Sequence, residues 1–410
     1  MRLLPANQRV VITGLGVLSS IGIGAAQFRE GLQAGRSGVG QLTAFDVAGY
    51  DHANGCPVVG FTPQRWLRTE PLARLGRASQ FAVAAARMAM QDAGLVEDDL
   101  RQRRGQVCVG TTDAESHDSD KLAELEVAGG PQAMDPVLAG RLSADRLSAS
   151  IAWEFGLADA ETVTIATACS AGNYAIASGL DALRLGDADF ALCGGSDAIC
   201  RKSFTAFYRL GAIAPDVCRP FDRGRQGILN GEGAGIMVLE TLESALARGA
   251  RIYAEVLGYG MNCDAQHPVA PDEDSVARCM ELALADAGVR PGQISFISAH
   301  GTGTRANDLT ETRAIRRVYG AAVPPTVSVK SMLGHAMGAA SALAAIACAL
   351  AITHGFIPPT INHVETDPEC EIDCVPNHYA EADVRIVQNN GLAFGGNNAV
   401  VILGKYEGPS

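Results

Sequence analysis

Short apolar runs alternate with longer amphipathic segments along most of the chain. Runs of strand length lie at residues 9–12, 107–110, 163–168, 189–193, 236–239, 254–259, 294–299, 327–330 and 399–403. Apolar residues at helical spacing occur at residues 79–93, 173–185, 275–287 and 336–353. Because strands alternate with helices, the pattern predicts an α/β protein with a largely parallel sheet in each half.

The segment 336–353 is apolar over about the length of a membrane span. Alanine dominates it, it contains Ser341, and it directly follows Gly334 and His335. These features favour a helix buried inside a large core, and we expect no membrane association.

Composition narrows the function classes. The 410 residues predict two or three domains, and a net charge of −12 without a basic run argues against nucleic-acid binding. The negative net charge does not exclude an acidic carrier protein as a partner, because binding one would need only a local basic patch. The 11 cysteines are odd in number and scattered, which indicates reduced thiols in a cytoplasmic protein. The N-terminus has too short an apolar region for a signal peptide.

Some local patterns resemble binding motifs but lack essential parts. Gly14 and Gly16 follow an apolar run as in a dinucleotide fingerprint, but Ser19 stands where the third glycine belongs. The glycines of 231–235 lack a phosphate-binding lysine and precede a strand, so they indicate close backbone approach. A zinc cluster would combine Cys370 and Cys374 with nearby histidines His363 and His378. The spacing lacks the paired knuckle pattern, so no metal site is expected.

The segment 113–126 carries six acidic residues. Their spacing does not match a calcium-binding loop. The segment predicts a solvated excursion or a lid.

Cys169 lies between the apolar run 163–168 and the helical pattern 173–185. A thiol at a helix N-terminus is exposed to the positive end of the helix dipole, which lowers its pKa. It is therefore a candidate nucleophile, although a small buried core residue explains the same position.

Other strand ends carry chemically active residues. His300 follows the strand predicted at 294–299, and Lys330 and His335 follow the strand predicted at 327–330. Sites in layered α/β folds gather at the carboxyl ends of strands. A cysteine and two histidines brought together there could combine nucleophilic attack with proton handling.

The motifs around these residues resemble those of the β-ketoacyl-acyl carrier protein synthases of the thiolase superfamily. They are TACSAG at Cys169, AHGTGT at His300, SVKSMLGH at Lys330 and His335, and FGGNN near the end. The resemblance extends over nearly the whole chain, and the pairing of one cysteine with two histidines is that of the elongating, decarboxylating branch. It implies a five-layered αβαβα fold of two similar halves, residues 1–250 with the nucleophilic cysteine and residues 251–410 with the histidines.

The resemblance also implies the residue roles. Cys169 would take the acyl chain from a carrier protein, and His300 and His335 would stabilise the enolate formed when a malonyl-carrier thioester loses carbon dioxide. Further implied residues are Lys330 paired with Glu311, Asp308 in a supporting role, Thr302 and Thr304 on the phosphopantetheine arm, and the gate Phe394, Gly395 and Gly396, with the N–H groups of Cys169 and Phe394 as oxyanion hole. No metal or free cofactor is implied, because phosphopantetheine arrives on the acyl carrier protein.

Two departures from the family pattern leave the pathway open. Ala393 precedes the gate phenylalanine and Asn397 follows the glycines, where the family commonly has the sequence GFGGTN. The acidic segment 113–126 stands where fatty-acid elongating members of the family usually have a glycine-rich, apolar sequence near the dimer interface. The chain could be a fatty-acid elongating homodimer, or a polyketide or polyene ketosynthase paired with a homologous chain-length factor. A non-catalytic chain-length factor and a coenzyme A thiolase are further alternatives.

Overall fold

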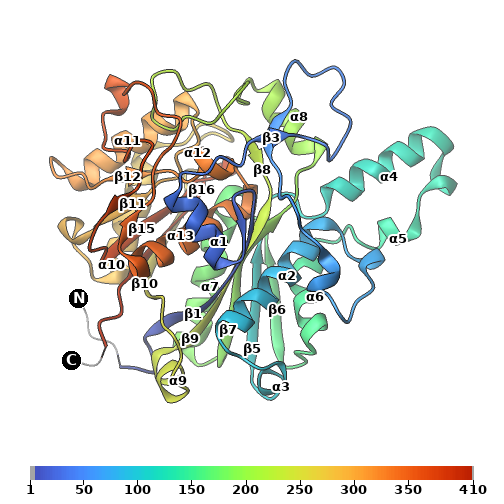
Figure 1. The fold of residues 1–410 in the computed structure, drawn as a ribbon, viewed down its shortest axis with the longest axis horizontal. Coiled ribbons are helices and arrows are strands. Elements are labelled where there is room, and N and C mark those ends of the chain that lie inside the picture. The colour runs from blue at the N-terminus through green and yellow to red at the C-terminus, as the bar shows by residue number, and fades with distance from the viewer. Residues whose placement is uncertain (1–4, 409–410) are drawn as a thin grey trace.

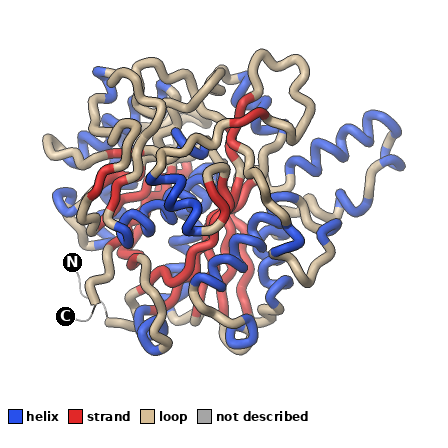
Figure 2. Tube along the Cα trace, in the orientation of Figure 1, coloured by secondary structure: helices blue, strands red, loops and turns tan. Residues whose placement is uncertain are grey.

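The structure is a computed structural model that describes residues 5–408. Its centre is a mixed sheet with helices on both sides, and the strands run through the middle of the molecule (Figure 2). The first five long strands, in spatial order, are β6 (Ala160–Ile165), β5 (Gly105–Gly110), β7 (Phe190–Asp197), β9 (Gly233–Thr241) and β1 (Val10–Ser19). The second five are β12 (Thr326–Val327), β11 (Phe296–Ser298), β15 (Ile386–Gly391), β16 (Asn397–Gly404) and β10 (Ala254–Cys263).

The two sets of strands have the same topology. Numbered along the chain within each set, both have the spatial order 3-2-4-5-1. In each set, strands 2, 3 and 4 are parallel, and strands 5 and 1 are antiparallel to their neighbours. The two similar halves are thus confirmed, but the prediction of largely parallel sheets holds for only three strands of each half. The boundary at residue 250 stays a prediction.

The two halves meet edge to edge. Val10, Val11 and Ile12 of β1 pair antiparallel with Val256, Glu255 and Ala254 of β10, which joins both sets into one 11-stranded sheet that also includes β2 (Gly22–Ile23).

Two helices occupy the centre, α7 (Ala171–Leu185) and α13 (Ala340–His354) (Figure 1). Each contacts strands of both halves, and they contact each other. A methyl group added at Gly172 would lie 2.6 Å from the backbone nitrogen of Ala342, so small residues permit this close approach. The helical segment Met337–His354 is apolar enough to cross a membrane, but 89% of it is buried within the fold, which confirms the core helix.

Outer helices complete the five layers. One side is covered by α2 (Arg77–Asp92) and α6 (Arg146–Phe155), the other by α10 (Glu273–Ala287) and α11 (Arg305–Tyr319). The predicted αβαβα architecture is confirmed. The remaining helices and strands are α1 (Ala25–Gln33), β3 (Gly40–Gln41), β4 (Asn54–Cys56), α3 (Glu97–Leu100), α4 (Ser116–Gly129), α5 (Pro136–Ala139), α8 (Arg201–Arg209), β8 (Asn230–Gly231), α9 (Leu242–Ala247), α12 (Lys330–Leu333), β13 (Phe356–Ile357) and β14 (Ala380–Glu381).

The glycines near the N-terminus do not form the expected turn. Strand β1 continues without a break through Gly14 and Gly16 to Ser19. A methyl group at Gly16 would lie 1.8 Å from the carbonyl oxygen of Ala85, so these glycines let α2 pack directly on the strand. This packing leaves no phosphate-binding turn there.

The acidic segment is a solvated excursion only in its second part. Part of it forms α4, which stands out from the body of the molecule (Figure 1). Asp113, Glu115 and Asp118 are nevertheless buried, and Glu115 Oε1 accepts the N–H of Ser79 (2.7 Å) in the first turn of α2. Burial of these carboxylates was missed because their partners are distant in sequence.

Candidate active site

Three side chains from separate loops meet at one point. Cys169 lies in a 3₁₀ turn (Ala168–Ser170) after β6, His300 follows β11, and His335 follows α12. The Cys169 Sγ and one ring nitrogen of each histidine lie within 4.8 Å of one another. The two imidazole rings are 5.5 Å apart and nearly perpendicular, at 82°. A molecule held here can contact the thiol and both rings at once.

Cys169 is buried and held in a strained turn. Ala168 has a φ of 51°, a left-handed conformation that an alanine adopts at a cost. The hydroxyl of Ser170 donates to the carbonyl of Asn397 (2.8 Å), which anchors the turn to the C-terminal half. Burial raises the pKa of the Cys169 thiol to about 12, against the influence of the Lys330 ammonium. The prediction of a lowered pKa is wrong for this buried thiol, because desolvation disfavours the thiolate.

Both histidines are neutral. Burial and the nearby Lys330 charge lower the pKa of His300 and His335 well below 6.5. The N–H of Met337 donates to Nδ1 of His335 (3.1 Å), so the ring proton of neutral His335 lies on Nε2. This ring therefore presents a hydrogen-bond donor at Nε2.

The expected contact between Lys330 and Glu311 is replaced by an indirect arrangement. Lys330 Nζ donates to the carbonyl oxygen of His300 (2.6 Å), whereas Glu311 accepts the N–H groups of His300 (2.7 Å) and Gly301 (2.8 Å). Within residues 5–408 no hydrogen bond or ion pair joins the two charged groups directly. Burial lowers the pKa of Lys330, and the Glu311 charge opposes that shift. Both side chains are buried and hold opposite sides of the His300 backbone.

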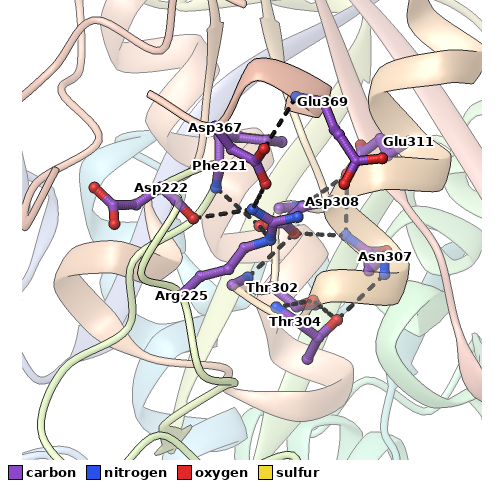
Figure 3. Close-up of polar contacts among 12 residues, drawn as sticks. Phe221, Asp222, Arg225, Thr302, Thr304, Asn307, Asp308, Glu311, Asp367 and Glu369 are labelled. Atoms are coloured by element: carbon purple, nitrogen blue, oxygen red, sulfur yellow. Dashed lines mark hydrogen bonds and ion pairs between the residues drawn. The ribbon is translucent and has the colours of Figure 1, made fainter. Parts of the chain in front are cut away.

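The loop after His300 is fixed by a second buried carboxylate (Figure 3). Asp308 accepts the N–H of Gly303 (3.2 Å) through one oxygen and the N–H of Phe221 (2.8 Å) through the other. Arg225 lies 3.7 Å from the same carboxylate, and burial raises the pKa of Asp308 to about 6. Asp308 therefore shapes the loop that carries Thr302.

An open cavity of about 190 Å³ leads to the three reactive groups. Thr302 and Thr304 line it and share a hydrogen bond between their hydroxyl oxygens (2.9 Å). The other lining residues are Cys169, Phe207, Leu210, Ala212, Ile228, Val269, Pro271, His300, Ala306, Asn307, His335, Leu392, Ala393 and Phe394. A long, thin substrate arm can reach the thiol from this side.

Phe394 lines the same cavity as the threonines. Its side chain is 36% exposed and its ring centroid lies 5.2 Å from that of Phe207. Its backbone N–H points toward the Cys169 sulfur and favours the thiolate. Gly395 and Gly396 follow with φ of 82° and 76°, and a methyl group at Gly396 would collide with Asp264. This turn requires glycine, as the FGG text suggests.

Metal binding would have to use the same three residues. They form the one cluster of three metal-ligating side chains found among residues 5–408. The raised pKa of Cys169 and the buried Lys330 ammonium both disfavour a cation there. The cysteines at 370 and 374 form no such cluster, since only Cys374 approaches His363, at 3.7 Å.

Some supporting residues were missed in the sequence. Asn390 donates to Glu311 (3.0 Å), Ser328 donates to the carbonyl of Gly301 (2.6 Å), and Asp197 holds the turn after His335 through the N–H of Gly338 (2.6 Å). Asp197 had a usable signal, because it is a carboxylate directly at the end of an apolar strand. The other two act from distant segments and carry no local signal.

Comparison with known proteins agrees with this geometry. The family model described as "Beta-ketoacyl synthase, N-terminal domain" matches residues 7–245, and "Beta-ketoacyl synthase, C-terminal domain" matches residues 253–364. The chain belongs to the β-ketoacyl synthase family. It is an acyltransferase, a ketosynthase that forms β-ketoacyl products.

Similar proteins carry several different names. The chain is 37% identical to a 3-oxoacyl-[acyl-carrier-protein] synthase 2 of Synechocystis over 98% of this chain and 99% of the relative. It is 38% identical to Nodulation protein E of Rhizobium meliloti, over 96% and 98%. Among solved structures, "The ishigamide ketosynthase/chain length factor" is 63% identical with a TM-score of 0.96, over 97% of this chain and 99% of that one. A type II polyketide ketosynthase bound to its acyl-carrier protein is 32% identical with a TM-score of 0.89, over the same shares.

Proposed function

We propose that this chain is the condensing subunit of a dissociated, carrier-protein-based pathway, in which Cys169 is the nucleophile. The observation that carries the proposal is the meeting of the thiol and two neutral imidazoles within 4.8 Å at the end of an open cavity. The Cys169 sulfur attacks the acyl thioester, the proton of its thiol passes to the departing carrier thiolate, and the acyl chain stays on the sulfur. The N–H groups of Cys169 and Phe394 stabilise the oxyanion formed in this step.

The condensation step uses the two histidines. A malonyl-carrier thioester enters, its carboxylate leaves as carbon dioxide, and the electron pair passes into an enolate. His335 donates from Nε2 to the developing thioester oxyanion, and His300 donates beside it. The enolate carbon then attacks the acyl-enzyme, Cys169 leaves as thiolate, and the product is a β-ketoacyl thioester two carbons longer. Lys330 and Glu311 act by holding the His300 backbone.

The second substrate is delivered on an acyl carrier protein. Thr302 and Thr304 place their hydroxyls along the cavity, where they suit the amide groups of a phosphopantetheine arm. Phe394, with Gly395 and Gly396 as its hinge, admits the acyl chain. We propose that no free cofactor is required, since decarboxylation drives the condensation, and that the protein works in the cytoplasm.

We further propose that the pathway makes a polyketide and that a homologous chain-length factor is the partner. The 63% identity to the ishigamide ketosynthase/chain length factor, together with the likeness to a type II PKS ketosynthase, supports this pathway more strongly than the 37% identity to a 3-oxoacyl-[acyl-carrier-protein] synthase 2. The projecting segment around α4 exposes apolar side chains that a partner subunit would cover, namely Leu125, Val127 and Val137. A fatty-acid elongating homodimer remains the second candidate, favoured by the curated relatives.

Intact-protein mass spectrometry tests the proposal. The chain, purified alone and co-expressed with a homologous partner subunit, is incubated with acyl-carrier thioesters of different length and unsaturation. We expect acylation of wild type and none of Cys169→Ala, and activity with unsaturated chains only when the partner is present. Equal loading of saturated medium chains by a self-paired dimer would support the fatty-acid alternative. Condensation by Cys169→Ala at the wild-type rate would overturn the assignment of the nucleophile.

A further inference from the structure

Asp197, at the end of β7, collects an unusual number of hydrogen bonds. Its carboxylate is fully buried and accepts from five donors. Three bind Oδ1: the hydroxyl of Thr111 (2.6 Å) and the N–H groups of Asp113 (2.9 Å) and Ala114 (3.1 Å). Two bind Oδ2: the N–H groups of Thr112 (2.8 Å) and Gly338 (2.6 Å). Asp197 thus ties the loop after β5 to the turn after His335.

That turn sets the orientation of His335. Met337, directly before Gly338, has a φ of 48° and donates its N–H to Nδ1 of His335. The turn is also tightly enclosed, because a methyl group at Gly338 would lie 2.5 Å from the backbone of Thr111. A left-handed methionine is unfavourable by itself and persists only where its surroundings hold it. The short bond from Gly338 to Asp197 supplies such a hold.

We propose that Asp197 is a positioning residue that keeps His335 in the Nε2–H tautomer by fixing the Met337–Gly338 turn. This inference rests on the proposed role of His335 as an oxyanion donor. In the other tautomer, Nε2 would present a lone pair to the enolate oxygen and repel it. Decarboxylation therefore depends on Asp197, whereas transfer of the acyl chain to Cys169 does not require the His335 donor.

The substitution Asp197→Asn tests the proposal with little change in shape. An asparagine has one oxygen and one NH₂ group, and the NH₂ cannot accept an N–H. The NH₂ group will take the place of Oδ2, which faces two donors, Thr112 and Gly338. The remaining oxygen will take the place of Oδ1, which faces three donors. The variant therefore breaks the link to the His335 turn selectively. Thr111→Val is the matched control, since it removes one hydrogen bond to the same carboxylate and leaves the Gly338 bond in place.

Three measurements are made on the enzyme with its partner subunit: acylation of Cys169, release of carbon dioxide from malonyl-carrier protein, and the ¹⁵N shifts of His335. Removing an oxyanion donor costs about 10²–10³ in rate. Since His335 stays in the site, we expect decarboxylation by Asp197→Asn to fall about 10- to 100-fold, with acylation within about twofold of wild type. The ¹⁵N shifts should change from the Nε2–H form to a mixture, and Thr111→Val should resemble wild type in all three.

The outcomes separate the two proposals. Unchanged ¹⁵N shifts and equal decarboxylation in Asp197→Asn and Thr111→Val would overturn the role of Asp197. If wild type shows the Nε2–H tautomer but neither loads an acyl chain nor decarboxylates malonyl-carrier protein, the proposed function fails and the tautomer measurement still tests Asp197.

Wild type supplies a second test if Asp197→Asn does not fold. Burial and the neighbouring Asp113 raise the pKa of Asp197 to about 7, and a proton on this carboxyl must displace one of the five donors. The groups that act on Asp197 are Asp113 from the loop after β5 and Lys202 of α8, which pairs with Asp113 (2.8 Å). The neighbouring Cys169 has a pKa near 12 and both histidines have lowered pKa values, so Asp197 titrates separately from them. The His335 shifts should follow the Asp197 carboxyl ¹³C shift between about pH 6 and 8; a His335 spectrum constant through that titration would overturn the proposal.

Discussion

Replacing Glu311 by glutamine should destabilise the fold, because this carboxylate is surrounded by donors. It is fully buried. Oε1 accepts the N–H of His300 (2.7 Å) and the amide of Asn390 (3.0 Å), and Oε2 accepts the N–H of Gly301 (2.8 Å) and the amide of Asn307 (3.3 Å). A glutamine can keep only one of these oxygens, so either orientation leaves one backbone N–H without an acceptor.

Two effects set the magnitude. A buried donor left without its partner costs about 1–3 kcal/mol. The nearby Lys330 ammonium, 3% exposed, also loses its counter-charge, and removing one member of a buried ionic arrangement costs about 3–5 kcal/mol. Lys330 can release its proton, and burial already lowers its pKa, which limits the second effect. We expect Glu311→Gln to lower the free energy of unfolding by about 3–5 kcal/mol.

Urea unfolding at neutral pH measures this change. Glu371→Gln is the matched control, since that side chain is 79% exposed and its ion pair with Arg316 is long, at 3.7 Å; its effect should stay within about 0.5 kcal/mol. In the double variant with Lys330→Met, the cost should fall below the sum of the single costs by about 1–3 kcal/mol. The difference in free energy of unfolding between wild type and Glu311→Gln should also become smaller as pH rises. A lysine with a lowered folded pKa binds more protons in the unfolded state, so the fold gains stability with rising pH. This gain is larger in the variant, which lacks the Glu311 charge that raises the pKa of Lys330. A loss below about 1 kcal/mol would refute this account of Glu311.

Three other predictions concern the central helices, the nucleophile and the gate. Gly172→Ala should lower the free energy of unfolding in urea by about 1–3 kcal/mol, because its methyl group would lie 2.6 Å from the facing helix. Gly292→Ala, with open space at its methyl position, should leave this free energy almost unchanged, and equal effects of the two substitutions would contradict the close packing. Alkylation of Cys169 by iodoacetamide should rise about tenfold per pH unit from pH 7 to 10, because a pKa near 12 keeps the thiolate scarce; a plateau by pH 8 would mean that the helix N-terminus outweighs burial. Phe207→Ala removes the ring that lies 5.2 Å from the Phe394 ring, an aromatic contact worth about 0.5–1.5 kcal/mol. This variant should raise the KM for acyl-carrier substrate about two- to tenfold and leave the alkylation of Cys169 unchanged. An unchanged KM would show that the ring pair has no part in substrate entry.

The parts of the fold that sequence patterns predicted are those with a local cause. The buried helix α13 follows from a run of small apolar residues, and the turns at Cys169, His300 and Gly395 follow from glycine and small residues beside a strand. Their chemistry is visible because the reactive residue and the turn that presents it are adjacent in the chain. The layered architecture then follows from alternating strands and helices together with the family motifs.

The parts that patterns missed depend on distant partners. The N-terminal glycines indicate a turn until the backbone of α2 is seen against them. The strand predicted at 163–168 as buried is β6 (Ala160–Ile165), which lies at the edge of the sheet and is largely half-exposed. Strand β15 and helix α11 were not predicted at all, because polar residues dominate them: β15 contains Gln388, Asn389 and Asn390, all buried.

The prediction of a lowered pKa for Cys169 was wrong for the same reason. A helix N-terminus is visible in sequence and lowers a thiol pKa, whereas the desolvation that raises it comes from the whole surrounding core. Lys330 and Glu311 gave a similar error: both are present, but each contacts the His300 backbone instead of the other side chain. Residue identity in a motif predicts which groups meet, and the intervening backbone decides how they interact.

Buried polar contacts join the two halves beside the candidate site. Cys169 comes from the first half and both histidines from the second, so neither half alone contains all three side chains. Asn389 of β15 donates to the amide oxygen of Asn173 of α7 (2.8 Å), and Ser341 of α13 accepts the N–H of Asn173 (3.1 Å). These polar groups are buried, so separating the halves would leave them without partners in an apolar interface. These hydrogen bonds hold the central helices together, and Cys169 precedes α7 as His335 precedes α13. We therefore expect a change that loosens the helices to weaken condensation before it unfolds the protein.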